Sequence, residues 1–172
     1  MRLQTAQRLL WDIDSDSDGP TDNQWRVGRQ HIICGDCLEL LATLGSATID
    51  IVITSPPYNI GVAYRSYDDQ RPREAYLGWL SRIGRELHRV MRSDASFFLN
   101  VGSTNSDPWI AQDVASAFRD VFVLQNHIIW VKSISIGDDT VGHFKPISSQ
   151  RFLNHNHESL FHFTKFGGVP LD

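Results

Sequence analysis

The stretch of sequence that decides the fold is residues 49–59, which read Ile-Asp-Ile-Val-Ile-Thr-Ser-Pro-Pro-Tyr-Asn. The β-branched residues of its first half predict a buried strand over Asp50–Thr54. Neither Pro56 nor Pro57 can donate a backbone hydrogen bond, so the two prolines must end the strand in a stiff turn. Because ligands bind beyond the carboxyl ends of strands in open α/β sheets, this turn is a candidate binding site.

The groups that this turn presents suit a planar ligand that carries an amine. The Ser55 hydroxyl and the Pro56 carbonyl can each accept a hydrogen bond from an exocyclic amine. The Tyr58 ring can stack on the flat face of a nucleobase, a contact worth about 1–3 kcal/mol. An ordinary strand-ending turn is the alternative interpretation of the same residues.

Strands and helices alternate along the rest of the chain, which predicts an α/β fold with a mostly parallel sheet and helices on both faces. The clearest helix is Glu74–Arg92, whose apolar residues recur at three- and four-residue spacing. The other expected elements are strands at Gln30–Cys34, Ser96–Val101, Val121–Val131 and Ser159–Thr164, and helices at Leu38–Leu44 and Trp109–Phe118. Only a long loop, Lys132–Asn156, separates the last two strands, so we expect them to pair antiparallel.

Composition describes an ordinary globular protein. Hydrophobic residues make up 41% of the 172 residues, and the formal net charge of −4 gives no global basic signature for nucleic acid. No apolar stretch reaches transmembrane length and no signal-peptide pattern is present, so we expect a cytoplasmic protein with no membrane partner. We predict no metal site, and we interpret Cys34 and Cys37, a lone C-x-x-C pair, as reduced core thiols.

The run Ser55-Pro56-Pro57-Tyr58 after an apolar strand resembles the catalytic motif of the DNA amino-methyltransferases. These enzymes use S-adenosylmethionine to methylate cytosine at N4 or adenine at N6. The wider context, residues 32–59, resembles the N-terminal part of the family's β-class order, in which the catalytic half precedes a glycine-rich cofactor motif. The resemblance implies a Rossmann-like methyltransferase sheet, mostly parallel with an antiparallel last strand.

The same resemblance implies a chemistry for the turn. A base of double-stranded DNA would be flipped out of the helix into the turn, where Ser55, Pro56, Pro57 and Tyr58 would be the catalytic residues. The amine would then attack the methyl group of S-adenosylmethionine directly. A serine at the first motif position favours cytosine N4 over adenine N6.

Further roles follow from the resemblance for residues outside the motif. The residues expected at the cofactor are Asp36, Thr54 and Ser55, with a helix N-cap as the alternative role of Asp36. The residues expected at the DNA are Asn59, Tyr64, Arg65, Arg71, His143 and Lys145. Solvated loop charge is the alternative for the arginines. His157-Glu158 and the strand after them resemble a family segment that would hold the flipped base or order the catalytic loop.

The resemblance covers only the catalytic half of such an enzyme. The glycine-rich cofactor loop is not in the sequence, and residues 166–170, Phe-Gly-Gly-Val-Pro, do not fit it. We therefore expect residues 1–28 to be a peripheral, acidic, mobile segment and residues 29–172 to be an incomplete catalytic part. A separate C-terminal half, a second subunit or a homodimer would be its partner. Two alternatives stay open: a non-catalytic remnant that binds DNA or a partner, and an amino-methyltransferase that acts on RNA.

Overall fold

A computed structural model describes residues 23–64, 67–136, 139–142 and 156–170. The chain divides into two compact units, Met1–Leu40 and Leu41–Asp172. None of the helices in the described part is long and apolar enough to cross a membrane.

The first unit contains a β-hairpin. β1 (Gln24–Val27) pairs antiparallel with β2 (Gln30–Ile33) around Gly28, whose φ of 57° lies in the left-handed region that glycine adopts without steric cost. The strand predicted at residues 30–34 therefore forms. However, its partner is β1 in a separate two-stranded sheet, not a strand of the parallel sheet that the alternating pattern had suggested.

α2 (Cys37–Thr43) follows this hairpin and extends into the second unit. Its first turn is capped by Asp36, whose Oδ1 accepts hydrogen bonds from the backbone N–H groups of Leu38 at 2.8 Å and Glu39 at 3.3 Å. Cys34 and Cys37 are both exposed, so their interpretation as core thiols was wrong. The reason is that the β-hairpin and the start of α2 bury few of their side chains.

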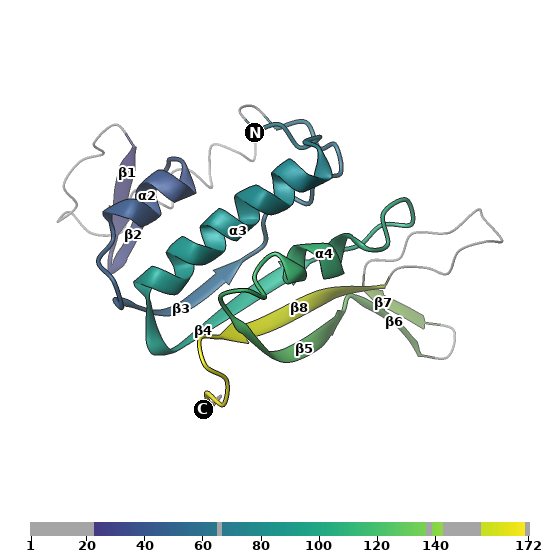
Figure 1. The fold of residues 1–172 in the computed structure, drawn as a ribbon. Helices are drawn as coiled ribbons and strands as arrows, with labels where there is room; N and C mark the ends of the chain where they lie inside the picture. The colour runs from purple at the N-terminus through teal and green to yellow at the C-terminus, as the bar shows by residue number, and fades with distance from the viewer. Residues whose placement is uncertain (1–22, 65–66, 137–138, 143–155, 171–172) are drawn as a thin grey trace. The chain divides into compact units, whose positions relative to one another are not determined.

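The second unit is built on a four-stranded sheet with the order β3-β4-β8-β5 (Figure 1). Its strands are β3 (Ile49–Thr54), β4 (Met91–Val101), β5 (Val123–Val131) and β8 (His157–Thr164). β3 pairs parallel with β4, and β8 pairs antiparallel with both β4 and β5. Three strands thus run in one direction and the last strand is inserted against them, which confirms the predicted antiparallel last strand.

α3 (Arg73–Val90) and α4 (Ile110–Ser116) pack on one face of this sheet (Figure 1). The apolar spacing of α3 places Tyr76 and Leu80 in a core with Phe97 of β4 and Phe163 of β8, and all four side chains are at most 2% exposed. Helices had been expected on both faces of the sheet. On the opposite face of the edge strand β3, Ile51 and Ile53 remain 54% and 72% exposed in the described structure.

α3 ends two residues before the predicted boundary. Met91 already has extended backbone angles, φ −72° and ψ 145°, and begins β4. The carbonyls of Arg89 and Val90 accept hydrogen bonds from the N–H groups of Ala47 and Thr48, at 3.1 and 2.8 Å. These bonds satisfy the open end of the helix from the segment that leads into β3, so the helix and the first strand of the sheet are joined there.

The long loop predicted at residues 132–156 contains a second hairpin. β6 (Ser133–Ile136) pairs antiparallel with β7 (Asp139–Gly142). Residues 143–155, which include the predicted DNA contacts His143 and Lys145, lie outside the described residues.

Candidate functional site

The turn that follows β3 is where the sequence predicted a binding site. β3 ends at Thr54, which is paired with Leu99 of β4, and the ladder does not continue into the prolines. Tyr76 of α3 holds the turn in place, because its hydroxyl donates a 2.6 Å hydrogen bond to the carbonyl of Pro57. Tyr76 is fully buried, and burial raises the pKa of its phenol, so the donor keeps its proton.

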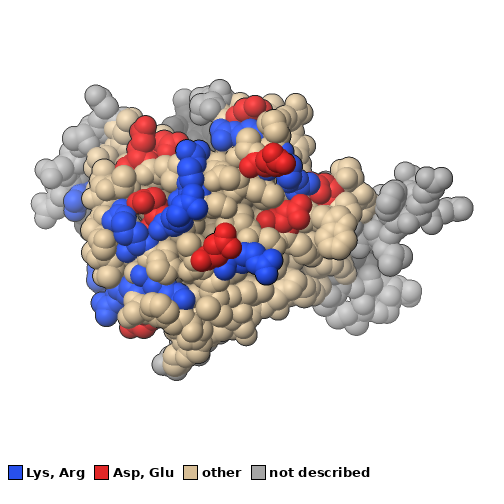
Figure 2. Space-filling view, viewed as in Figure 1, with Lys and Arg blue, Asp and Glu red and all other residues tan. Residues whose placement is uncertain are grey.

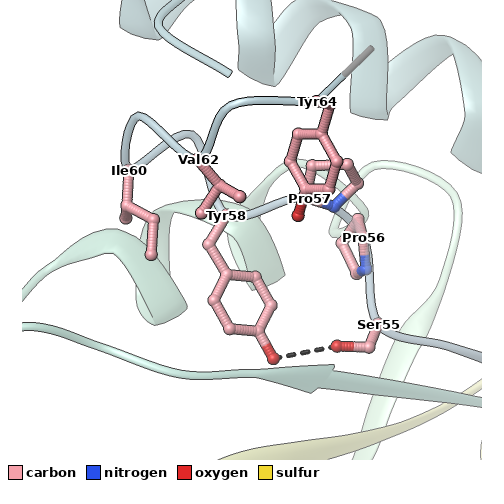
Figure 3. Close-up of a pocket in the computed structure, with 7 residues that line it drawn as sticks. All are labelled: Ser55, Pro56, Pro57, Tyr58, Ile60, Val62 and Tyr64. Carbon is pink, nitrogen blue, oxygen red and sulfur yellow. Dashed lines mark hydrogen bonds between the residues drawn. The ribbon is translucent and has the colours of Figure 1, made fainter. Parts of the chain in front are cut away.

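Ser55 and Tyr58 face one another across this turn. Their hydroxyl oxygens are 2.8 Å apart and share a hydrogen bond (Figure 3). Together they open onto a cavity of about 450 Å³, within the range of small-molecule sites. The residues that line it are Ser55, Pro56, Pro57, Tyr58, Ile60, Val62 and Tyr64. The four predicted motif residues and one predicted DNA contact, Tyr64, therefore meet at a single pocket.

One buried carboxylate shapes the pocket wall that follows Tyr58. Asp69 is 3% exposed and accepts hydrogen bonds from the backbone N–H groups of Asn59, Ile60 and Val62, at 2.9, 3.1 and 2.9 Å. Asn59 has a φ of 59°, a left-handed conformation that asparagine tolerates better than most residues. The chain therefore curls around the Asp69 carboxylate, and the loop carries Ile60 and Val62 into the pocket lining.

Two of the predicted DNA contacts also hold this loop together. The side-chain amide of Asn59 exchanges two hydrogen bonds of 2.8 Å with the backbone of Arg71. The guanidinium of Arg71 lies over the ring of Tyr67, 4.6 Å from its centroid, and 5.5 Å from that of Trp79. A contact of either side chain with DNA stays a prediction. Arg65 lies outside the described residues.

A hydrogen-bonded chain reaches the pocket from the neighbouring strands. Asn100, near the end of β4, donates from Nδ2 to the Tyr58 hydroxyl at 3.3 Å and to Oε2 of Glu158 at 2.7 Å. Lys132 donates to Oε1 of Glu158 at 2.6 Å. Burial on its own would raise the pKa of Glu158, but the hydrogen bonds from Lys132 and Asn100 and the charge of Lys132 outweigh it and lower the pKa.

Sequence reasoning missed Asn100 and identified Glu158 only through the resemblance. A signal for Asn100 was present, since it lies at the carboxyl end of the strand parallel to β3, where side chains of adjacent strands meet. Gly102 follows it closely. A Cβ at Gly102 would stand 3.2 Å from Cε2 of Tyr58 and 3.4 Å from Cγ of Glu158, so only a small residue leaves room for both.

The structure also shows where the two other predicted cofactor residues, Asp36 and Thr54, lie. Asp36 belongs to the first unit and caps α2, as its alternative role required. Thr54 is the last residue of β3 and directly precedes the pocket. Their contacts with a cofactor stay predictions. Among the described residues, no cluster of His, Cys, Asp and Glu side chains could hold a metal ion.

The charge is mixed on the face of the molecule that carries α3. Figure 2 shows acidic and basic side chains interspersed over the face that carries α3. On the described residues of that face, the lysines and arginines do not form a continuous positive surface for phosphates.

Comparison with known proteins agrees with this arrangement. A family model described as "DNA methylase" (N6_N4_Mtase) matches residues 49–168. The Type II methyltransferase M.BglII of Bacillus subtilis is 29% identical over 160 residues, which are 88% of this chain and 41% of the relative. The DNA adenine methyltransferase YhdJ of Escherichia coli K12 is 28% identical over 99 residues, 58% of this chain and 32% of the relative.

Solved structures share the fold. TTHA0409 of Thermus thermophilus superposes with a TM-score of 0.57 at 25% identity, covering 80% of this chain and 53% of that protein. The cytosine-N4-specific PvuII DNA methyltransferase has a TM-score of 0.58 at 19% identity, covering 77% and 48% of the two chains. The chain thus spans about half the length, or less, of these relatives.

Proposed function

Because this chain belongs to the DNA methylase family whose model matches residues 49–168, we propose that it takes part in methyl transfer from S-adenosylmethionine to the exocyclic amine of a base in DNA. The observation that carries the proposal is the pocket at the turn that follows β3. It brings a serine hydroxyl, two prolines and a tyrosine ring to one cavity at the carboxyl end of β3.

The pocket's own groups account for how an amine would be activated. An aromatic amine is a weak nucleophile because its lone pair is delocalised into the ring. Hydrogen bonds from the amine to Ser55 Oγ and the Pro56 carbonyl would draw the lone pair back onto nitrogen. Pro56 can present its carbonyl because the turn carries no strand ladder there, and Tyr76 holds the adjacent Pro57 carbonyl in place.

The base must leave the duplex to reach this pocket, since its amine is otherwise inside the helix. Flipping costs a few kcal/mol, and stacking on Tyr58 would offset part of that cost. A cavity of about 450 Å³ with an apolar wall of Ile60 and Val62 is large enough for one base. We assign Asn59, Tyr64, Arg65, Arg71, His143 and Lys145 to the surrounding DNA.

S-adenosylmethionine, when bound, supplies an electrophilic methyl group on a sulfonium. A second structure of TTHA0409, 24% identical and with a TM-score of 0.55, was solved with this molecule bound. In this chain we assign Ser55 in the pocket lining, Thr54 directly before it and the Asp36 carboxylate to the cofactor. These few groups fit only part of so large a ligand, and the family's glycine-rich loop is not in the sequence. We therefore propose that a further polypeptide segment, a second subunit or a second copy of the chain completes the cofactor site.

We propose cytosine N4 rather than adenine N6 as the acceptor atom, because a compact serine hydroxyl stands at the first motif position. Relatives with both specificities are similar to this chain, since YhdJ is an adenine methyltransferase and the PvuII enzyme is cytosine-N4-specific. The absent glycine-rich loop favours one second candidate, a non-catalytic half that binds DNA or a partner.

The proposal can be tested by transfer of labelled methyl groups from S-adenosylmethionine to mixed-sequence duplex DNA. Ser55→Ala should lower the rate on the order of a hundredfold, equivalent to about 2.7 kcal/mol of transition-state stabilisation. Ser93→Ala removes an exposed serine at the start of β4 and should leave the rate unchanged.

Each outcome of this assay has a clear meaning. Wild-type rates in Ser55→Ala would remove the role of the serine. Transfer to RNA in preference to DNA would support the RNA alternative. Transfer that remains absent when a polypeptide with the family's glycine-rich cofactor loop is added would support the non-catalytic half.

A further inference from the structure

We propose that Glu158 is a positioning residue that acts through Asn100 to set the direction of the hydrogen bond between Tyr58 and Ser55. The inference rests on the proposed function for its consequence, but the hydrogen-bonded chain itself can be tested without catalysis. It extends from Glu158 at the start of β8, through Asn100 of β4, to the two hydroxyls of the turn.

The position of Glu158 follows from the sheet. β4 and β8 pair antiparallel, with Val101 opposite Ser159, so Asn100 and Glu158 come close at the end of the two strands. The Glu158 side chain is 18% exposed and is held at both oxygens, by Lys132 at 2.6 Å and by Asn100 at 2.7 Å. Gly102 leaves the space in which Glu158 and the Tyr58 ring both lie.

The chemistry of these groups dictates where the protons lie. An ionised carboxylate can only accept hydrogen bonds, so Asn100 must turn its amino group toward Glu158. The second hydrogen of that amino group is then directed at the Tyr58 oxygen, 3.3 Å away. With its oxygen occupied as an acceptor, Tyr58 donates its own proton to Ser55 Oγ at 2.8 Å.

This direction matters for Ser55. Its oxygen accepts one hydrogen bond from Tyr58 and keeps its second lone pair for the substrate amine. Without the carboxylate, Asn100 can rotate its amide and present Oδ1, which has no hydrogen-bond partner among the described residues. Tyr58 would then donate to Asn100 instead, and Ser55 would lose the contact that holds it toward the pocket.

The first experiment uses NMR of the 172-residue chain with ¹³C-labelled tyrosine rings. The sequence has only four tyrosines, so single Tyr→Phe variants assign the signals. Glu158→Ala should shift or broaden the Tyr58 ring signals and leave those of Tyr67 and Tyr76 in place. Glu158→Gln, which can still accept a hydrogen bond from Asn100, should restore most of the wild-type Tyr58 signal.

Glu74→Ala is the matched control, since it removes an exposed carboxylate from the first turn of α3. It should leave the Tyr58 signals unchanged. Tyr58 signals that stay at their wild-type positions in Glu158→Ala, in a chain whose Tyr76 signals show it to be folded, would overturn the proposal. If Glu158→Ala does not fold, Asn100→Ala gives the same test, and an unaltered Tyr58 signal there would also overturn it.

A kinetic readout separates positioning from substrate binding. In an active preparation, Glu158→Ala should lower kcat on the order of tenfold, with the KM for DNA changed by less than about twofold. In a Tyr58→Phe background, the same Glu158→Ala change should cause no further loss, because the contact that it positions is already gone. Equal losses in both backgrounds would overturn the proposed action of Glu158 through this hydrogen-bonded chain. An inactive wild-type protein would count against the proposed function alone, because the NMR result by itself tests whether Glu158 orients the hydrogen bond between Tyr58 and Ser55.

Discussion

The hydroxyl of Tyr76 offers the sharpest test of how the turn is held. Tyr76→Phe removes one oxygen and leaves the buried ring and its packing in place. That oxygen donates the 2.6 Å hydrogen bond to Pro57, and Tyr76 is 0% exposed. A lost hydrogen bond costs about 1 kcal/mol, and a carbonyl left partly without a donor adds to it. We expect the free energy of unfolding to fall by about 1–2 kcal/mol.

Tyr67→Phe is the matched control for this change. The Tyr67 hydroxyl is also buried, but it has no hydrogen-bond partner among the described residues. Removing it should be neutral, or stabilising by up to about 1 kcal/mol, because no bond is lost and a buried polar group disappears. Both variants keep an aromatic ring, so the difference between them isolates the hydrogen bond to Pro57.

Urea unfolding followed by tryptophan fluorescence measures both variants. The midpoint should fall for Tyr76→Phe and stay or rise for Tyr67→Phe, with the slope of the transition unchanged. Methyl transfer should also decrease in Tyr76→Phe, because the Pro-Pro turn loses its support. Equal midpoints for the two variants would contradict this role of Tyr76, since its hydroxyl would then stabilise the fold no more than a hydroxyl without a partner.

Three further predictions concern the Asp69 carboxylate, two glycines of α3 and the buried His162 side chain. Asp69→Asn replaces one of the two accepting carboxylate oxygens by a donor. We therefore expect the free energy of unfolding to fall by about 2 kcal/mol and amide hydrogen exchange in residues 59–62 to become faster. Unchanged exchange would contradict the role of the carboxylate. Gly84→Ala should destabilise the fold by about 1–3 kcal/mol, because its Cβ would stand 2.9 Å from Phe118. Gly78→Ala in the same helix meets nothing within 4 Å and should stabilise the fold by about 0.5–1 kcal/mol. Urea midpoints that move in the same direction for both variants would contradict this packing. Burial lowers the pKa of His162, so folding favours the neutral imidazole. The free energy of unfolding should therefore decrease as the pH falls below about 6.5. If His162→Asn showed the same pH dependence as the wild-type protein, this contribution of His162 would be excluded.

The sequence predicted the central part of the fold because the signals there are local. A β-branched run followed by two prolines can hardly be anything but a strand that ends, and β3 ends at Thr54 as expected. The periodic apolar residues of α3 placed that helix to within two residues. The inserted antiparallel strand β8 followed from the absence of a helix between the last two strands and from the family resemblance.

Signals that depend on distant residues were harder to detect. The hairpin of β1 and β2 lay partly in a segment interpreted as peripheral, and the turn at Gly28 was not recognised. The hydrogen-bonded chain joins Asn100 to Tyr58, 42 positions away, and to Glu158, 58 positions away. Asn100 and Glu158 come together only through the register of β4 against β8. Asn59 and Arg71 were predicted as DNA contacts, but the hydrogen bonds between them could not be foreseen without the loop's path.

The identity of the modified nucleoside decides whether the pocket of Ser55 and Tyr58 transfers a methyl group to cytosine N4. The chain should be incubated with S-adenosylmethionine and duplex DNA, alone and with a polypeptide that carries the family's glycine-rich cofactor loop. The DNA is then digested and its nucleosides are identified by mass spectrometry. We expect N4-methylcytosine from the wild-type chain and a large loss of it from Ser55→Ala. Methylation at cytosine C5, or N4-methylcytosine formed equally well by Ser55→Ala, would contradict this expectation.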